Sequence, residues 1–186
     1  MRKALDALYG AALFGACFSM LAIAALVFIQ VLARVLDWIV QLLGMPRFGF
    51  IIPSLAEIGG FLFVAASFLA LPAALRSAGH VRVTLVLRFL SPTADKVLTA
   101  LVLLVALGLT IFAAWALGLQ ALASFERGSV SYGIIAIPLW LPQAVMSLGV
   151  VIFAVAIIDE TVTLLSGREP AFRQVERTRE ATEGGH

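Results

Sequence analysis

The chain has 186 residues, of which 62% are hydrophobic and 13% charged, whereas soluble domains have about 45–50% apolar and about 25% charged residues. This excess of apolar residues excludes an ordinary soluble domain and indicates an integral membrane protein. The formal net charge is +2, and the basic residues gather at the ends of apolar stretches, which indicates orientation in a membrane rather than binding to nucleic acid.

The first uncharged stretch runs over residues 7–33, after the positive start Arg2-Lys3. The apolar region of a removable signal peptide has about 7–15 residues, so this longer stretch predicts a retained transmembrane helix. It contains the single cysteine of the chain, Cys17. With no second cysteine, disulfides within the chain and cysteine-based metal sites are excluded.

Three further uncharged stretches cover residues 58–75, 97–125 and 128–158. Each is long enough for a spanning helix, which needs roughly 17–25 residues. The last stretch begins with a glycine- and serine-rich segment typical of a loop, and Pro138 suits a first helical turn. The fourth span is therefore expected over residues 138–158, which makes four transmembrane helices.

The basic residues predict the orientation of these helices. Three of them, Arg34, Arg47 and Arg127, lie on one side of the membrane, and ten lie on the other: Arg2, Lys3, Arg76, Arg82, Arg88, Lys96, Arg168, Arg173, Arg177 and Arg179. Short loops rich in Lys and Arg stay in the cytoplasm, so both termini are expected there. Aromatic residues that suit the opposite, outer boundary are Trp38, Tyr132 and Trp140.

Between the second and third spans, residues 80–90 are apolar with regular polar positions. His80, Thr84 and Arg88 share one helical stripe, although the even positions also fit the period of a strand. An isolated strand at membrane depth would leave backbone groups unpaired, so we expect a short amphipathic helix in the interface. Residues 1–165 then form the transmembrane domain, and the charged residues 166–186 are expected to be a disordered cytoplasmic tail.

Few polar side chains lie within the spans. Gln30 and Arg34 are one turn apart at the outer end of the first span, and Glu57 opens the second from the same side. An ionisable group at depth usually has a partner, so an Arg34–Glu57 ion pair is expected. Gln120 and Gln143 are the other strongly polar candidates in the third and fourth spans.

No acidic or basic residue occupies the middle of a span, and the two histidines are His80 and His186. A transporter that works without partner subunits usually has ionisable residues near the membrane centre or interrupted helices. A haem within the helix bundle requires histidines inside the membrane. No catalytic set, phosphate-binding loop or metal-ligand cluster is visible either. We therefore expect no enzyme activity, no cofactor, and no metal or substrate site on this chain.

Small residues at helical spacing offer surfaces on which helices approach closely. They form Ala11-xxx-Gly15 in the first span, Ala66-xxx-Ala70-xxx-Ala74 in the second and Ala114-xxx-Gly118 in the third. The sequence leaves open which helices these stripes bring together, and whether they pack within the chain or against a partner.

Several short motifs occur in a characteristic order. They are Gln-Val-Leu-Ala-Arg at residues 30–34, Glu57, Gly-His-Val-Arg-Val at residues 79–83 and Ile-Pro-Leu-Trp at residues 137–140. With the four-span topology, this order resembles the small membrane subunit (DctQ-like) of tripartite ATP-independent periplasmic (TRAP) transporters, over about residues 5–165. Thr84 stands where the family often has an acidic residue, a departure that puts any charge-dependent role of that position in doubt.

The resemblance implies a multi-pass protein of the bacterial inner membrane that belongs to a three-part complex. A periplasmic binding protein captures a substrate, usually an organic acid, and a large membrane subunit carries it by a sodium-driven elevator movement. The small subunit is a non-catalytic scaffold that also helps to dock the binding protein, and sodium coupling belongs to the large subunit. Candidate structural or subunit-contact residues are Gln30, Arg34, Glu57, His80, Arg82 and Trp140.

The alternative interpretation is a stand-alone small transporter or channel that acts as a homo-oligomer. It would need a polar path, which only Gln30, Arg34, Glu57, Gln120 and Gln143 could line. The substrate is not encoded in this chain under the favoured interpretation.

Overall fold

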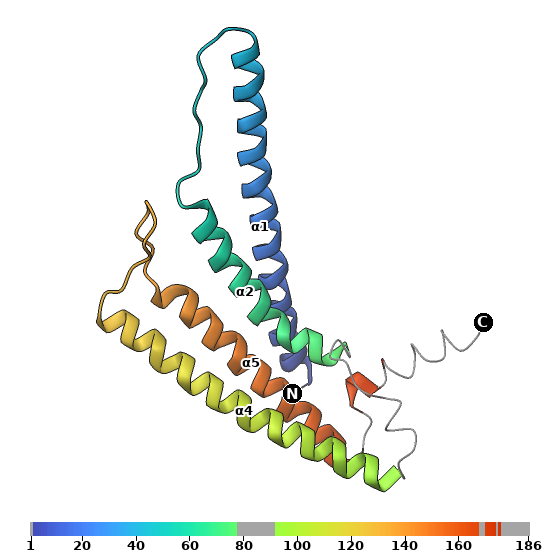
Figure 1. The fold of residues 1–186 in the computed structure, drawn as a ribbon. Helices are drawn as coiled ribbons and strands as arrows, with labels where there is room; N and C mark the ends of the chain where they lie inside the picture. The colour runs from blue at the N-terminus through green and yellow to red at the C-terminus, as the bar shows by residue number, and fades with distance from the viewer. Residues whose placement is uncertain (1, 78–91, 168–169, 174, 176–186) are drawn as a thin grey trace, which may run out of the picture.

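The computed structural model describes residues 2–77, 92–167, 170–173 and 175. Four helices make up most of this part, namely α1 (Arg2–Leu42), α2 (Leu55–Arg76), α4 (Pro92–Glu126) and α5 (Trp140–Leu165) (Figure 1). Each is long and apolar enough to cross a membrane. The prediction of an all-α membrane protein with four spanning helices is confirmed.

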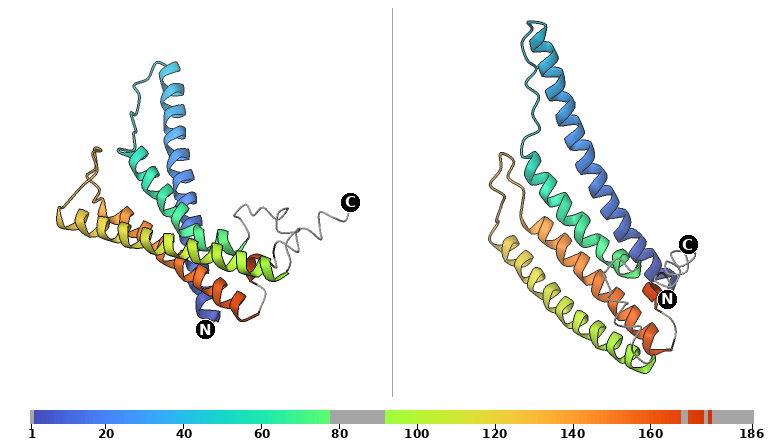
Figure 2. Two further views of the ribbon diagram at one scale, coloured as in Figure 1. Left: turned by 60° about the horizontal axis from the view of Figure 1, so that its bottom comes forward. Right: turned by 45° about the vertical axis from the view of Figure 1, so that its right-hand side comes forward.

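The helices pack side by side in the order α1, α2, α5, α4. Neighbours in this row share long contacts, whereas α1 and α5 meet over only a few residues. The right-hand view of Figure 2 shows this row, with α1 and α4 at its two edges. Such a row, unlike a closed bundle, leaves two broad faces of helix surface that the chain itself does not cover.

Small residues set the spacing of the row. Gly149 of α5 faces the backbone of α2 so closely that an added Cβ would lie 2.7 Å from the carbonyl carbon and oxygen of Phe68. Between α5 and α4, the Ser147 hydroxyl lies against Gly118 and donates a hydrogen bond of 3.5 Å to the Ala114 carbonyl. The Ala114-xxx-Gly118 stripe therefore packs within the chain, as small residues do between membrane helices.

The helices extend beyond the ends expected from their charged residues. α1 continues past residue 33 to Leu42 and carries Arg34 and Asp37, and α5 continues past residue 158 to Leu165 and carries Glu160. Asp37 and Glu160 are tolerated because the segment after each helix donates backbone N–H groups to them, which the pattern of a single helix does not reveal.

Two expectations fall wholly or partly on residues that the structure does not describe. The predicted interfacial helix at residues 80–90, with His80 and Arg82, lies outside the described residues, and so does most of the predicted tail. Residues 171–173 are helical, and Phe172 is buried. The expectation of a disordered cytoplasmic tail over residues 166–186 stays a prediction.

Candidate functional site

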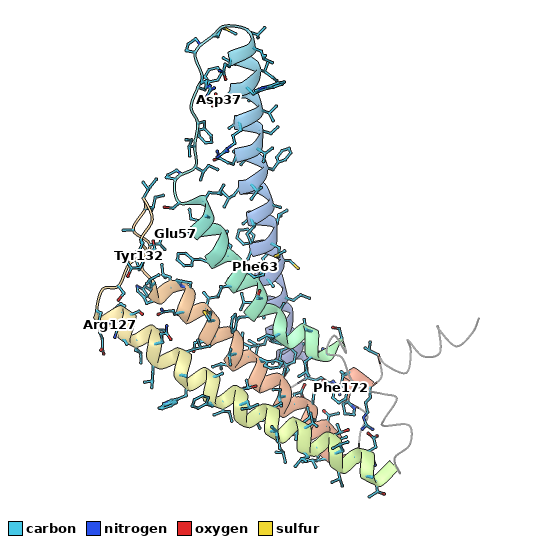
Figure 3. All side chains as sticks on the ribbon, viewed as in Figure 1. Asp37, Glu57, Phe63, Arg127, Tyr132 and Phe172 are labelled. Atoms are coloured by element: carbon cyan, nitrogen blue, oxygen red, sulfur yellow. The ribbon has the colours of Figure 1, made fainter. Side chains whose placement is uncertain are left out.

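Polar side chains gather at the two ends of the helix row. We use "inner" for the end of the row that holds the N-terminus and "outer" for the opposite end. At the inner end, the polar side chains form what we call the inner cluster: Asp6, Tyr9, Arg76, Asp95, Glu160 and Arg173. At the opposite end, the outer cluster consists of Ser54, Glu57 and Ser131. Beyond the outer cluster, α1 and the connection to α2 form a projecting hairpin (Figure 3).

Arg76, at the end of α2, is the centre of the inner cluster. Its Nη1 atom lies 2.9 Å from Asp6 Oδ1, and its Nε atom lies 4.0 Å from Glu160 Oε1. The guanidinium also lies over the Tyr9 ring, 5.0 Å from the centroid, a distance at which cations are attracted to aromatic rings. One side chain of α2 thus binds α1 and α5 together.

Glu160 is the buried member of this cluster, with 3% of its surface exposed. A buried carboxylate needs hydrogen bonds and a counter-charge to offset its lost hydration. Its Oε2 atom accepts a hydrogen bond of 2.9 Å from the backbone N–H of Ala171, and Arg76 supplies positive charge. Glu160 therefore holds the segment after α5 against the helix row.

A second ion pair fixes the same segment to α4. The Nη2 atom of Arg173 lies 2.7 Å from Asp95 Oδ2 and donates a hydrogen bond of 2.8 Å to the Thr99 hydroxyl. Phe172 is buried beside it and is labelled in Figure 3. Through this segment, the inner cluster links all four helices at one end.

The outer cluster joins the start of α2 to the turn between α4 and α5. Ser131 donates a hydrogen bond of 3.2 Å to Glu57 Oε2, and the Ile135 N–H donates one of 3.0 Å to the Ser54 hydroxyl. Any side chain at position 133 would overlap the Glu57 carboxylate and the Ser54 hydroxyl, so Gly133 permits this approach. The turn is closed by a β-bridge between Val130 and Pro138.

The expected ion pair between Arg34 and Glu57 is not formed, and this prediction was wrong. Glu57 hydrogen-bonds to Ser131 instead. The reason is the length of α1: the Ile52 N–H donates to Gln30 Oε1 at 2.8 Å, so the chain is already level with Gln30 before α2 starts. Glu57 follows Ile52 and lies on the inner side of Gln30. Arg34 lies one turn of α1 to the outer side of Gln30, so the two charged groups are separated.

Three α1 side chains hold the connection to α2 along the helix. Besides Gln30, which binds Ile52, Asp37 accepts hydrogen bonds from the N–H groups of Phe48 and Gly49, and Gln41 accepts one from the Arg47 side chain. Positions 30, 37 and 41 are spaced i, i+7 and i+11, which places them on one helix face. This spacing is readable in the sequence and could have indicated a segment held along the helix.

The remaining predicted residues have different settings. Trp140 packs edge-on against Phe125, with ring centroids 5.6 Å apart, so it joins the outer ends of α4 and α5. Gln120 is exposed on α4. Within the described part of the chain, Gln30 Nε2 and Gln143 Oε1 are buried without a hydrogen-bond partner.

Two apolar hollows lie toward the outer end of the molecule. One, of about 440 Å³, is lined by α1 and by Phe48 and Phe50 of the connection. The other, of about 310 Å³, lies between α2 and α5 and is lined by residues such as Phe61 and Leu141. Among the residues that the structure describes, no group of three or more His, Cys, Asp and Glu side chains is placed to hold a metal ion. The contacts that the structure does show hold helices and their connections together.

Comparison with known proteins gives one family. A family model described as "Tripartite ATP-independent periplasmic transporters, DctQ component" matches residues 23–167, which cover most of the chain. The matched region starts within α1 and ends just after α5. No curated protein matches the sequence.

Proposed function

The chain belongs to the DctQ family of tripartite ATP-independent periplasmic transporters, and on this premise we propose that it is the small, non-catalytic membrane subunit that scaffolds the large subunit. The large subunit would carry an organic acid by a sodium-driven elevator movement and would hold the sodium and substrate sites. A periplasmic binding protein would deliver the substrate and dock partly on this chain.

The open row of helices carries this proposal. Its charged groups pair within the chain at the inner end, while large apolar side chains such as Phe63, Phe112 and Trp115 stay exposed. Transport sites lie among polar groups or broken helices near the membrane centre. A chain whose exposed helix faces are apolar is therefore better suited to be a stationary scaffold beside a moving partner than to carry a transport site. The alternative, a stand-alone transporter or channel, would need a polar path lined by Gln30, Arg34, Glu57, Gln120 and Gln143. Two of these groups, Gln30 Oε1 and the Glu57 carboxylate, instead accept hydrogen bonds within the chain.

We propose that the protein resides in the bacterial inner membrane with both termini in the cytoplasm, on the ground of the ten-to-three distribution of basic residues. Single cysteines replacing Arg47 and Arg127, in a Cys17→Ala background, should react with an impermeant maleimide added to intact cells. A cysteine replacing His80 should react only after the cells are opened. Labelling of position 80 in intact cells without labelling of position 47 would reverse the orientation.

The test of function is transport by the complete three-part system reconstituted in vesicles. Omitting the chain should abolish uptake, because the large subunit loses its scaffold. Substituting Gln30, Gln120 or Gln143 by leucine should alter assembly or maximal rate, yet leave the half-saturating sodium and substrate concentrations within tenfold, which corresponds to about 1.4 kcal/mol. A larger shift in sodium affinity in a fully assembled complex would place a transport site on this chain and refute the scaffold.

A further inference from the structure

The helical hairpin beyond the outer end of α2, residues 30–54, is defined here as the outer arm. The Arg76–Asp6 ion pair aligns the inner ends of α1 and α2, and the Ile52–Gln30 hydrogen bond marks the level where the chain enters α2. Residues 31–42 of α1 therefore project past α2 by about 18 Å, at 1.5 Å per residue. Figure 1 shows this projection above the outer ends of α2, α4 and α5.

Tilting does not bring the outer arm into the hydrocarbon core. α1 has 41 residues and is about 60 Å long, whereas the core is roughly 30 Å thick. α2 has 22 residues, about 33 Å, so it must stand nearly upright to cross. α1 packs against α2 at its inner half and diverges from it toward its outer end (Figure 1). Even if α1 were inclined by about 45°, its length of about 60 Å would span about 42 Å along the membrane normal, so its last turns lie beyond the outer edge of the core.

The surface of the outer arm is nevertheless apolar. Its exposed large side chains include Trp38 (62% exposed), Phe48 (78%) and Ile51 (69%). Further exposed apolar side chains lie on the helix and on the connection that follows it: Leu36, Leu42, Leu43, Met45 and Phe50. An apolar surface of this size in water marks an interaction site.

Lipid is an unsuitable cover for this surface. Residues 45–52 are not helical, so their carbonyl groups lack helical partners, although α1 side chains bind the N–H groups of Phe48, Gly49 and Ile52. A backbone group left unpaired in hydrocarbon costs several kcal/mol. Arg34 is also exposed on the same hairpin. A surface that combines aromatic rings, open backbone groups and a charge is typical of a protein interface, where both kinds of group find partners.

The outer arm is already shaped for such a partner. Gln30, Asp37 and Gln41 clip the connection to α1, so its surface does not have to be ordered on binding, which lowers the cost of association. The hollow of about 440 Å³ between Leu36 and Phe48 can receive apolar side chains from outside.

We propose that the outer arm is a docking surface for the large membrane subunit on its outer side, with apolar side chains of that subunit in the hollow. This inference rests on the proposed function and specifies the contact. The large subunit is favoured over the binding protein because extensive apolar surface is typical of permanent interfaces. The soluble binding protein must dissociate after it delivers the substrate, which requires a more polar interface. A second copy of this chain is the competing occupant.

Photo-crosslinking in the assembled transporter tests the assignment. The crosslinking amino acid p-benzoylphenylalanine, placed at Trp38, Phe48 and Ile51, should give light-dependent products between this chain and the large subunit. Products with the binding protein, with a second copy of this chain or with lipid alone would overturn the assignment. Failure of the chain to co-purify with the large subunit in any form would instead contradict the proposed function, so the two failures are distinguishable.

A matched pair of variants gives a second measurement. Replacing Trp38, Phe48 and Ile51 together by alanine should reduce co-purification of the large subunit at least tenfold. Replacing Phe14 and Phe18, which are 73% and 62% exposed on the inner half of α1, should reduce it much less. Each purified variant is first compared with the unaltered chain by thermal unfolding, so that loss of fold is separated from loss of docking. Equal losses from the two sets of folded variants would contradict a docking role of the outer arm.

Discussion

Replacing Gly149 by alanine is expected to destabilise the protein by about 3 kcal/mol or more, at the upper end of the usual cost of overpacking. The new Cβ would lie 2.7 Å from both the carbonyl carbon and the oxygen of Phe68. Neither atom can move away by rotating a side chain, because both belong to the backbone of α2. The two helices must separate, and the central contact of the row is lost.

Gly108 provides the matched control, because it also lies within a helix and an added Cβ there meets nothing within 4 Å. Gly108→Ala should leave stability unchanged or slightly higher, since alanine is the better helix former. Unfolding of both purified variants in detergent, followed by helical circular dichroism, measures the difference. Equal stability of Gly149→Ala and Gly108→Ala would show that the contact between α2 and α5 does not depend on the missing side chain.

Gly149 also shows that stripes of small residues in the sequence do not identify every close contact between helices. The small-xxx-small stripes correctly selected Gly118, which packs against Ser147, and Gly15, whose added Cβ would lie 3.1 Å from Leu69. Gly149 belongs to none of the stripes identified. Close approach of two helices depends on where they cross, and the crossing point is set by the whole row rather than by spacing within one helix.

The number and order of the spans were predictable because the thickness of the membrane fixes the length of an apolar helix. The helix ends were less predictable. Charged residues predict boundaries, yet α1 continues through Arg34 and Asp37, and α5 continues through Glu160. Asp37 and Glu160 bind backbone N–H groups 11 residues further along the chain, so their positions are compatible with helices longer than the uncharged stretches.

Pairing between polar groups was the least predictable feature. Proximity in sequence suggested Arg34 and Glu57, but Glu57 binds Ser131, which lies on the turn before α5. The inner cluster was missed entirely, because Arg76 meets Asp6 and Glu160 only after α2 has packed between α1 and α5. The readable signal was the face formed by Gln30, Asp37 and Gln41, which indicates a segment held along the helix.

The inner cluster gives the second large effect: Arg76→Met should destabilise the protein by about 3 kcal/mol, the lower end of the range for stranding a buried charge. Methionine keeps much of the apolar stem but leaves Glu160, 3% exposed, without the guanidinium beside it. The contact with the Tyr9 ring is lost as well. Asp6→Asn should cost about 1 kcal/mol or less, because the Asp6 side chain is 50% exposed and water can replace its partner.

Glu160→Gln in the Arg76→Met background should recover part of this loss. The amide is neutral, so it needs no counter-charge, and its oxygen can still accept the hydrogen bond from the Ala171 N–H. The double variant is therefore expected to be more stable than Arg76→Met alone, a coupling that a double-mutant cycle measures directly. Unfolding of the four proteins in the same detergent supplies the cycle. If the two single losses simply add, the 4.0 Å approach of Arg76 to Glu160 contributes no net interaction, and Glu160 is held by its backbone hydrogen bond and packing alone.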